Sequence, residues 1–404
     1  MTNTDMINAE RGIITLDDLR DHLQYAIGLE LTTIPAYLCA LYTIIPDANS
    51  AACEVIQSVV LEEMLHMSLA ANVLNAIGGA PATGPVGDGP SPVPVYPATV
   101  PFIDAMPVIR LQAFSKAAVD DFIAIERPAP PEEAGPQAPP AGGRYGSIGA
   151  FYAAIEAGLR ALGTPDVFRR GRAARAGCQL TSEYYYGGAG TLIEVTDLDS
   201  ALAAVAEIVR EGEGLPRPVL GQTAHEHLLS GARTPGRLGA PYDVDDMDRL
   251  PFGWKMYSHY ARFKEIRAGR YYQPDQLVGE EPAGDILPVD WRAASPMTPD
   301  PAAQAYRGTW AYQPMMAFSA AYTALVDTVY RGFNGEPALL RQAVPGMYEL
   351  KYQANSLLNM PSPLDQNQTL GPAFEYLTLP RRTAAKLVYP QRRGAESGDA
   401  AVRH

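Results

Sequence analysis

Two long helical patterns near the start of the chain carry acidic and histidine side chains on their apolar faces. The first pattern spans about 15–45, and Glu30 lies in its apolar stripe. The second spans about 51–77, where Glu63 and His66 lie one turn apart in the apolar stripe. Because an unpaired charge on a buried face costs several kcal/mol, each of these groups needs a compensating partner, and a metal ion is one such partner.

Two later segments repeat this arrangement, at about 200–213 and 253–268. In the first of them Glu213 is nearly in phase with the buried stripe, whereas Glu211 is expected on the opposite face. In the second, His259 interrupts an apolar stripe. The sequence therefore predicts a mainly α protein, a four-helix bundle with long Pro/Gly-rich loops, whose core helices are these two segments and the two long patterns. Additional helices are expected outside the bundle, at about 114–125, 147–162, 314–332 and 336–358.

Composition limits the function classes. The 404 residues carry a net charge of −13, which argues against a nucleic-acid or anionic-membrane surface, since both need a local excess of Lys and Arg. No uncharged apolar run reaches the ~18 residues of a membrane helix, and three cysteines are too few for a disulfide framework, so a cytoplasmic protein is expected. We expect one domain over 13–380 and a flexible tail over 381–404.

Each candidate residue also has a structural explanation. A lone histidine on an apolar face is usually a core histidine, and a single Glu-x-x-His is usually a solvated helix face. Five such groups on four apolar stripes favour a metal site instead. His22 lies beside the first stripe and is interpreted as solvent-facing, and His225 and His227 as part of a polar loop, with a second pocket as the alternative. Pro35 predicts a kink, which either serves the site or fits the helix to its neighbours.

The sequence resembles the ferritin-like domain of iminophenyl-pyruvate dimer synthases, which act in oxidative coupling in violacein-type and related bisindole pathways. The resemblance rests on LELTTIPAYLCALYTI at 29–44, VLEEMLHMSLAANVLNAIGG at 60–79 and VTDLDSALAAVAEIVREGEG at 195–214, with shorter blocks such as FIAIERP at 122–128 and SHYARFKEI at 258–266. It implies a ferritin-like four-helix bundle that binds metal, with added helices and loops, in a bacterial secondary-metabolite enzyme or a stand-alone oxidative enzyme. The positions that match the metal ligands of the family are Glu30, Glu63, His66, Glu213 and His259.

One departure concerns the fourth bundle helix. A full di-iron bundle repeats Glu-x-x-His there, but Met256 stands three residues before His259. Glu62, Glu265 or a substrate group is expected to complete the shell.

The expected activity is that of an iron-dependent oxidase or oxygenase with one or two ions, manganese being the alternative metal, acting with O₂ on a small, amino-acid-derived metabolite. A homo-oligomer is compatible with this reading. The alternative from another class is a non-catalytic metal-binding or partner-binding protein. The sequence does not identify catalytic residues beyond the ligands.

Overall fold

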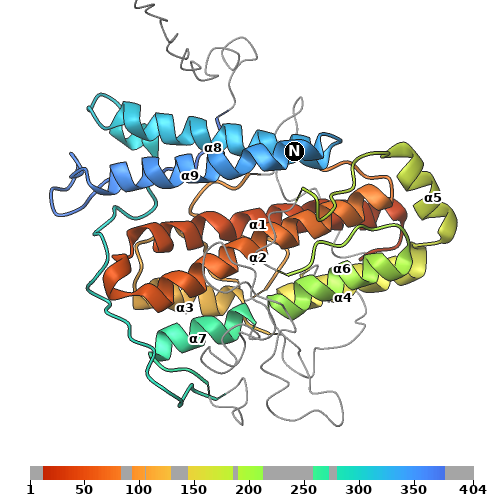
Figure 1. The fold of residues 1–404 in the computed structure, drawn as a ribbon, viewed down its shortest axis with the longest axis horizontal. Coiled ribbons are helices and arrows are strands. Elements are labelled where there is room, and N and C mark those ends of the chain that lie inside the picture. Colours follow the sequence, from red (N-terminus) through yellow and green to blue (C-terminus); the bar gives the residue numbers. More distant parts are fainter. Residues whose placement is uncertain are drawn as a thin grey trace, which may run out of the picture.

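A computed structural model describes residues 12–82, 93–104, 106–128, 144–184, 190–212, 258–272 and 280–377. The expected mainly helical fold is confirmed (Figure 1). The helices are α1 (Leu16–Thr43), α2 (Ser50–Ala76), α3 (Lys116–Ile125), α4 (Ile148–Leu162), α5 (Pro165–Ala174), α6 (Leu198–Glu211), α7 (His259–Ala268), α8 (Tyr312–Phe333) and α9 (Leu340–Leu358), with short 3₁₀ turns at Pro46–Ala48, Ala303–Tyr306 and Pro337–Leu339. Within these ranges the extended segments form only isolated bridges.

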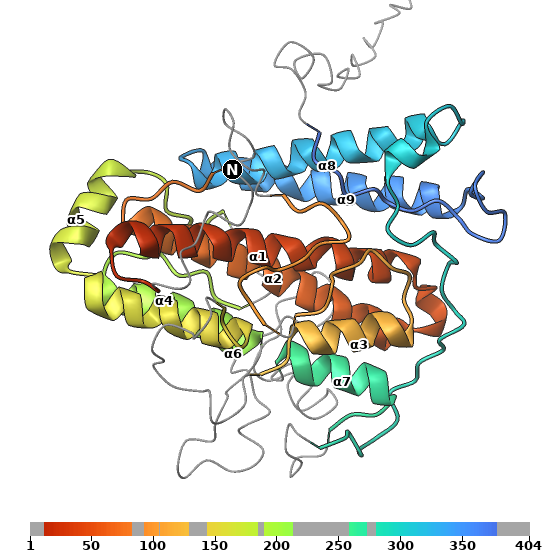
Figure 2. The same ribbon diagram turned by 180° about the vertical axis from the view of Figure 1, so that it is seen from behind.

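Helices α1 and α2 form an antiparallel hairpin at the centre of the molecule (Figures 1 and 2). The first begins at a capping box, in which the Thr15 hydroxyl accepts from the Asp18 N–H and the Asp18 carboxylate accepts from the Thr15 N–H at 2.7 Å. The second ends before Gly78, whose φ of +82° favours glycine. Pro35 lies inside α1, which continues past it. The apolar stripes of both helices are buried in one core.

Each of the other two legs of the bundle is made of two helices in succession. Helices α3 and α4 form one leg, and α6 and α7 form the other, as the views from both sides show (Figures 1 and 2). Helix α3 packs on α7, α4 packs on α6, and α2 contacts both α6 and α7. We expected 200–213 and 253–268 to be two separate legs. The structure instead places them in the same leg, since α6 has 14 residues and α7 has 10, against 28 in α1.

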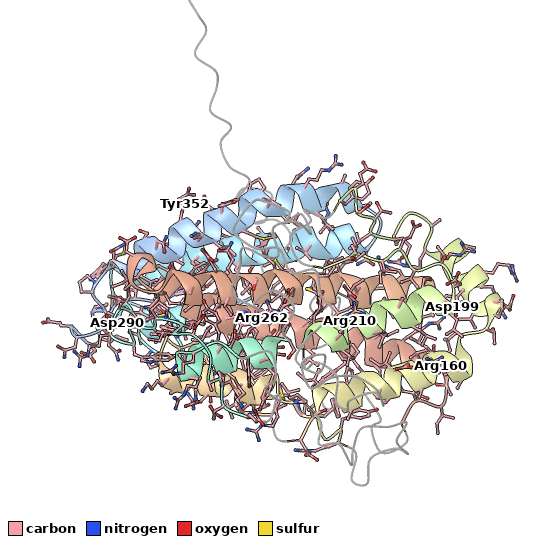
Figure 3. The ribbon with its side chains drawn as sticks, turned by 60° about the horizontal axis from the view of Figure 1, so that its bottom comes forward. Arg160, Asp199, Arg210, Arg262, Asp290 and Tyr352 are labelled. Atoms are coloured by element: carbon pink, nitrogen blue, oxygen red, sulfur yellow. The ribbon has the colours of Figure 1, made fainter. Side chains whose placement is uncertain are left out.

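The two halves of the second leg meet end to end. The Tyr260 N–H donates to the carbonyl of Gly212 at 3.5 Å, so the first turn of α7 follows the last turn of α6 although 213–257 separate them in the chain. Figure 3 shows the two helices in succession, with Arg210 labelled on α6 and Arg262 on α7. The junctions of both split legs therefore face the middle of the α1–α2 hairpin.

The α8–α9 hairpin packs on the opposite side of α1 and α2 (Figure 1). The junctions between the split legs therefore lie on the other side of the α1–α2 hairpin, where the ends of helices meet the core. By length and composition alone, α1 could cross a membrane, but 78% of its most apolar window is buried inside the structure, as in the core helix of a folded domain.

One interpretation of a polar residue in α1 was wrong. His22 is only 1% exposed, and its ring nitrogens lie 2.7 Å from the Asp18 carbonyl and 2.7 Å from the Tyr145 hydroxyl. The helical stripe indicated solvent because the loop carrying Tyr145, which covers this side of α1, is distant in the sequence. His225, His227, Met256 and the tail after 381 lie outside the described residues.

Candidate metal centre

Two groups of buried acidic and histidine side chains meet at the junctions of the split legs. Glu30, Glu63 and His66 form one group, and Glu63, Glu126 and His259 form the other, with potential ligand atoms within 4.8 Å of one another in each. Glu63 belongs to both groups. A carboxylate shared in this way can bridge two metal ions, as in the carboxylate bundles that bind two irons.

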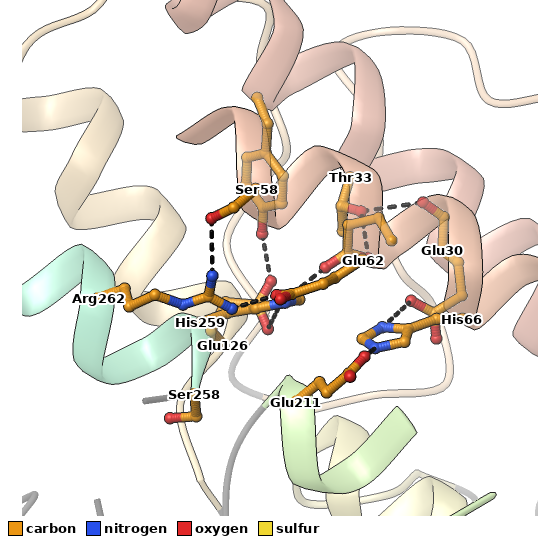
Figure 4. Close-up of polar contacts among 12 residues, drawn as sticks. Glu30, Thr33, Ser58, Glu62, His66, Glu126, Glu211, Ser258, His259 and Arg262 are labelled. Carbon is orange, nitrogen blue, oxygen red and sulfur yellow. Dashed lines mark hydrogen bonds and ion pairs between the residues drawn. The ribbon is translucent and has the colours of Figure 1, made fainter. Parts of the chain in front are cut away.

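His259, the first residue of α7, has a different partner on each ring nitrogen. Its Nε2 lies 2.7 Å from a Glu62 oxygen, and its Nδ1 lies 2.9 Å from a Glu63 oxygen and 3.6 Å from a Glu126 oxygen. Glu62 is also paired with Arg262, which donates to Ser58 at 2.8 Å (Figure 4). An outer carboxylate on Nε2 orients the ring and leaves Nδ1 to bind a metal.

His66 is oriented in the same manner from the other leg. Its Nε2 lies 2.9 Å from a carboxylate oxygen of Glu211, the last residue of α6, and its Nδ1 lies 3.7 Å from a Glu30 oxygen (Figure 4). His259 therefore presents Nδ1 to Glu63, and His66 presents Nδ1 to Glu30. The two imidazoles are nearly parallel, with centroids 5.4 Å apart.

Burial and mutual charge shift the protonation equilibria of the centre. Burial and the charge of Glu126 raise the pKa of Glu63 to about 8. Burial lowers the pKa of His66, but its bonds to Glu211 and Glu30 outweigh this effect and raise it to about 10. The corresponding effect of Glu126 and Glu62 raises the pKa of His259 well above its ordinary value. In the metal-free protein, protonation of the two histidines and of Glu63 therefore reduces the net negative charge of the cluster.

Two buried tyrosines hold the carboxylates of Glu30 and Glu126. Tyr152 of α4 donates its hydroxyl proton to Glu30, and Tyr37 of α1 donates to Glu126 at 2.5 Å. Thr33 donates to Glu63 at 3.0 Å. Each of the three carboxylates in the two groups is therefore fixed by a neutral hydroxyl donor, which leaves its remaining lone pairs for a cation.

A cavity of about 20 Å³ lies over this cluster. Glu30, Glu63, His66 and Glu126 contribute to its polar wall, and it reaches Gly212 at the end of α6. The rest of its wall is largely apolar. Its volume suits one small ligand group, since a water molecule needs ~10–15 Å³ by the same measure.

The structure brings together four of the five residues predicted from sequence, Glu30, Glu63, His66 and His259. The fifth, Glu213, lies outside the described residues. The expectation for Glu211 was wrong, because this residue is completely buried against His66. The helical phase was taken from Leu202 and Val209, which are only half-buried, whereas Glu211 shares the face of the buried Ala204 and Ile208.

Sequence reasoning missed Glu126, which follows the last residue of α3. Its only signal was a single acidic residue at the end of the apolar pattern FIAIE. Glu265 was considered as a ligand, but its carboxylate accepts from the Tyr272 N–H at 2.8 Å and is in neither group of the described structure. Glu62 contacts the outer nitrogen of His259 rather than completing the inner shell.

The donor set fits a divalent metal of the iron or manganese type, for which carboxylate and imidazole are suitable ligands. His259 Nδ1 is buried, and although a Glu63 oxygen lies 2.9 Å away, it makes no hydrogen bond of good geometry within the part of the chain that the structure describes. A buried polar atom of this kind costs free energy unless something binds it. The described residues thus form a candidate metal site with three carboxylates and two imidazoles.

Comparison with known proteins agrees with this architecture. The structure is similar to the crystal structure of a ferritin-like protein from Caulobacter vibrioides, with a TM-score of 0.52, 24% sequence identity, and coverage of 85% of this chain and 96% of that one. No curated protein matched the chain. The family model described as ferritin-like matches residues 23–268, which run from the second turn of α1 to the end of α7 and include both candidate metal-binding groups. The chain therefore belongs to the ferritin-like family.

Proposed function

We propose that this protein is an iron-dependent oxidase or oxygenase that acts with O₂ on a small, amino-acid-derived metabolite. The observation that carries the proposal is that Glu63 belongs to both metal-binding groups, each of which contains one histidine. The resemblance to iminophenyl-pyruvate dimer synthases supports the substrate class. Manganese is the alternative metal.

Five residues would hold the metal: Glu30, Glu63, His66, Glu126 and His259. When bound there, a pair of iron ions supplies the redox chemistry that activates O₂. Glu211 and Glu62 accept hydrogen bonds from the outer nitrogens of the two histidines, so that Nδ1 of each ring remains a metal-binding lone pair. Tyr152 and Tyr37 hold the Glu30 and Glu126 carboxylates in place. The largely apolar wall around the cluster limits the entry of water.

The proposal is tested by metal analysis together with O₂ consumption. The protein should contain bound iron in a fixed ratio, and O₂ consumption should depend on an added aromatic amino acid or its imino or keto acid. His66→Ala should lose most of the metal, because one imidazole is removed and the remaining carboxylates repel one another.

His22→Ala is the matched control, since His22 is equally buried but lies outside both groups. It should lower stability and retain the metal. Stoichiometric metal with no O₂ consumption in the presence of any of these metabolites would favour the non-catalytic alternative. Full metal content in His66→Ala would show that the centre has been assigned to the wrong residues.

A further inference from the structure

The hydrogen bond between the two halves of the split leg defines a common helical register. In an α-helix the N–H of one residue bonds to the carbonyl four places earlier. Tyr260 bonds in this way to Gly212, so His259 stands three places after Gly212 in the register of the leg. Gly212 and His259 are therefore spaced like Glu63 and His66 in α2.

The outer carboxylates support the same correspondence. Glu62 precedes Glu63 in α2 and contacts Nε2 of His259 at 2.7 Å, while Glu211 precedes Gly212 and contacts Nε2 of His66 at 2.9 Å. Each of the two elements, α2 and the split leg, thus supplies a carboxylate to the histidine of the other, so their ligand positions correspond. In that equivalence, Gly212 takes the place of a second Glu-x-x-His carboxylate.

The backbone does not require glycine at this place. Gly212 has φ −71° and ψ −87°, so it lies near the right-handed helical region and outside the left-handed region that favours glycine. A Cβ atom added there would lie 3.4 Å from the Ile208 carbonyl oxygen and 3.6 Å from a Glu126 carboxylate oxygen, both ordinary contacts. Gly212 also lines the cavity over the cluster. The missing side chain thus leaves space at the point where a carboxylate would otherwise approach the metal-binding groups.

We infer that the space at Gly212 receives a carboxylate from outside the chain, most simply that of the substrate, which completes the metal shell. A di-iron carboxylate bundle uses four carboxylates and two histidines, whereas the described groups hold three carboxylates and two imidazoles, so the position of one carboxylate ligand is open. The first turn of α4 contributes Ile148 and Gly149 to the same cavity, and the amino end of a helix favours an anion. The volume of about 20 Å³ admits a carboxylate group. The inference rests on the proposed metal centre and specifies its ligand class.

Three substitutions at one position separate charge from bulk. Gly212→Glu supplies the carboxylate within the chain, Gly212→Gln supplies the same bulk without charge, and Gly212→Ala adds only a methyl group. The probe is acetate, titrated calorimetrically into protein loaded with Mn²⁺. Metal content and affinity are measured on the same samples in the absence of acetate.

Wild-type protein should bind acetate only after it has been loaded with metal, and Gly212→Ala should bind it within a few-fold of wild type. Gly212→Glu should bind the weaker metal ion about tenfold or more tightly and lose acetate binding, since second-shell changes alone alter metal affinity by ~10–100-fold. Gly212→Gln should lose acetate binding without tighter metal binding.

Unchanged acetate affinity in a metal-loaded Gly212→Glu protein would overturn the inference, and so would loss of one metal ion from Glu213→Gln, because Glu213 would then supply the carboxylate. Wild-type protein that binds no metal would instead refute the proposed metal centre. The two failures are therefore distinguishable.

Discussion

His66 and Glu211 are paired across the bundle, with 2.9 Å between Nε2 and a carboxylate oxygen, although 145 positions separate them in the chain. The pair links the middle of α2 to the end of α6. Glu62 and His259 repeat it in the opposite direction, at 2.7 Å. The orientation of both histidines consequently depends on residues of another helix.

Glu211→Gln should weaken metal binding at the His66 position by about 10–100-fold, because a neutral amide holds the imidazole less firmly and lowers its basicity. Metal titration of the purified protein measures this effect. Glu207→Gln is the control, since Glu207 is also a buried residue of α6 but is paired with Arg210. Equal losses in the two variants would indicate a general effect on α6 instead of a role in orienting His66.

Glu126→Gln should remove most of the metal bound beside His259, because Glu126 is one of the three groups gathered there. Metal should remain at the Glu30–His66 position, so that content falls by about half if two ions bind. Metal analysis after gel filtration provides the measurement. Glu213→Gln is compared in parallel, and the variant with the lower metal content identifies which of the two carboxylates is a ligand.

Arg262→Met should lower the free energy of unfolding by about 3–5 kcal/mol, because it removes one of the two cationic partners of the fully buried Glu62 carboxylate. Burial raises the pKa of Glu62, but Arg262 and His259 outweigh this and lower it to about 2. Denaturant unfolding of the metal-free protein tests the prediction. The double variant with Glu62→Leu should recover part of the loss, and no recovery would mean that Arg262 acts mainly through packing.

Glu265 should make the metal-free protein less stable as pH rises. Burial raises its pKa to about 8, so the folded state holds a proton that the unfolded chain has lost above its ordinary pKa near 4.5. Its contribution is fully present below pH 4.5 and is lost as pH approaches 8. Glu265→Gln keeps a neutral acceptor for the Tyr272 N–H, so its stability should fall less between pH 5 and 8 than that of the wild type. The measurement is the free energy of unfolding of both proteins at pH 5 and pH 8. An equal decrease in the two proteins would contradict the prediction.

Periodicity alone identified α1 and α2 and the positions of Glu30, Glu63 and His66 on their faces. These inferences are local, since residues three and four apart on one helix share a face whatever the rest of the chain does. The same argument identified His259 as a buried group of α7. It could not show which helix would face it.

Tertiary structure decided the remainder of the candidate centre. Glu126 lies just beyond the end of α3, and the equivalence of Gly212 and Glu63 exists only because α6 and α7 meet end to end. Residues 213–257 separate Gly212 from Ser258 in the chain, so the three-place spacing between Gly212 and His259 cannot be read from the sequence. The sequence by itself determined which helix faces are apolar and which helices carry metal-binding groups. The packing of four short helices on α1 and α2 decided which of those groups meet, because that outcome depends on contacts between residues far apart in the chain.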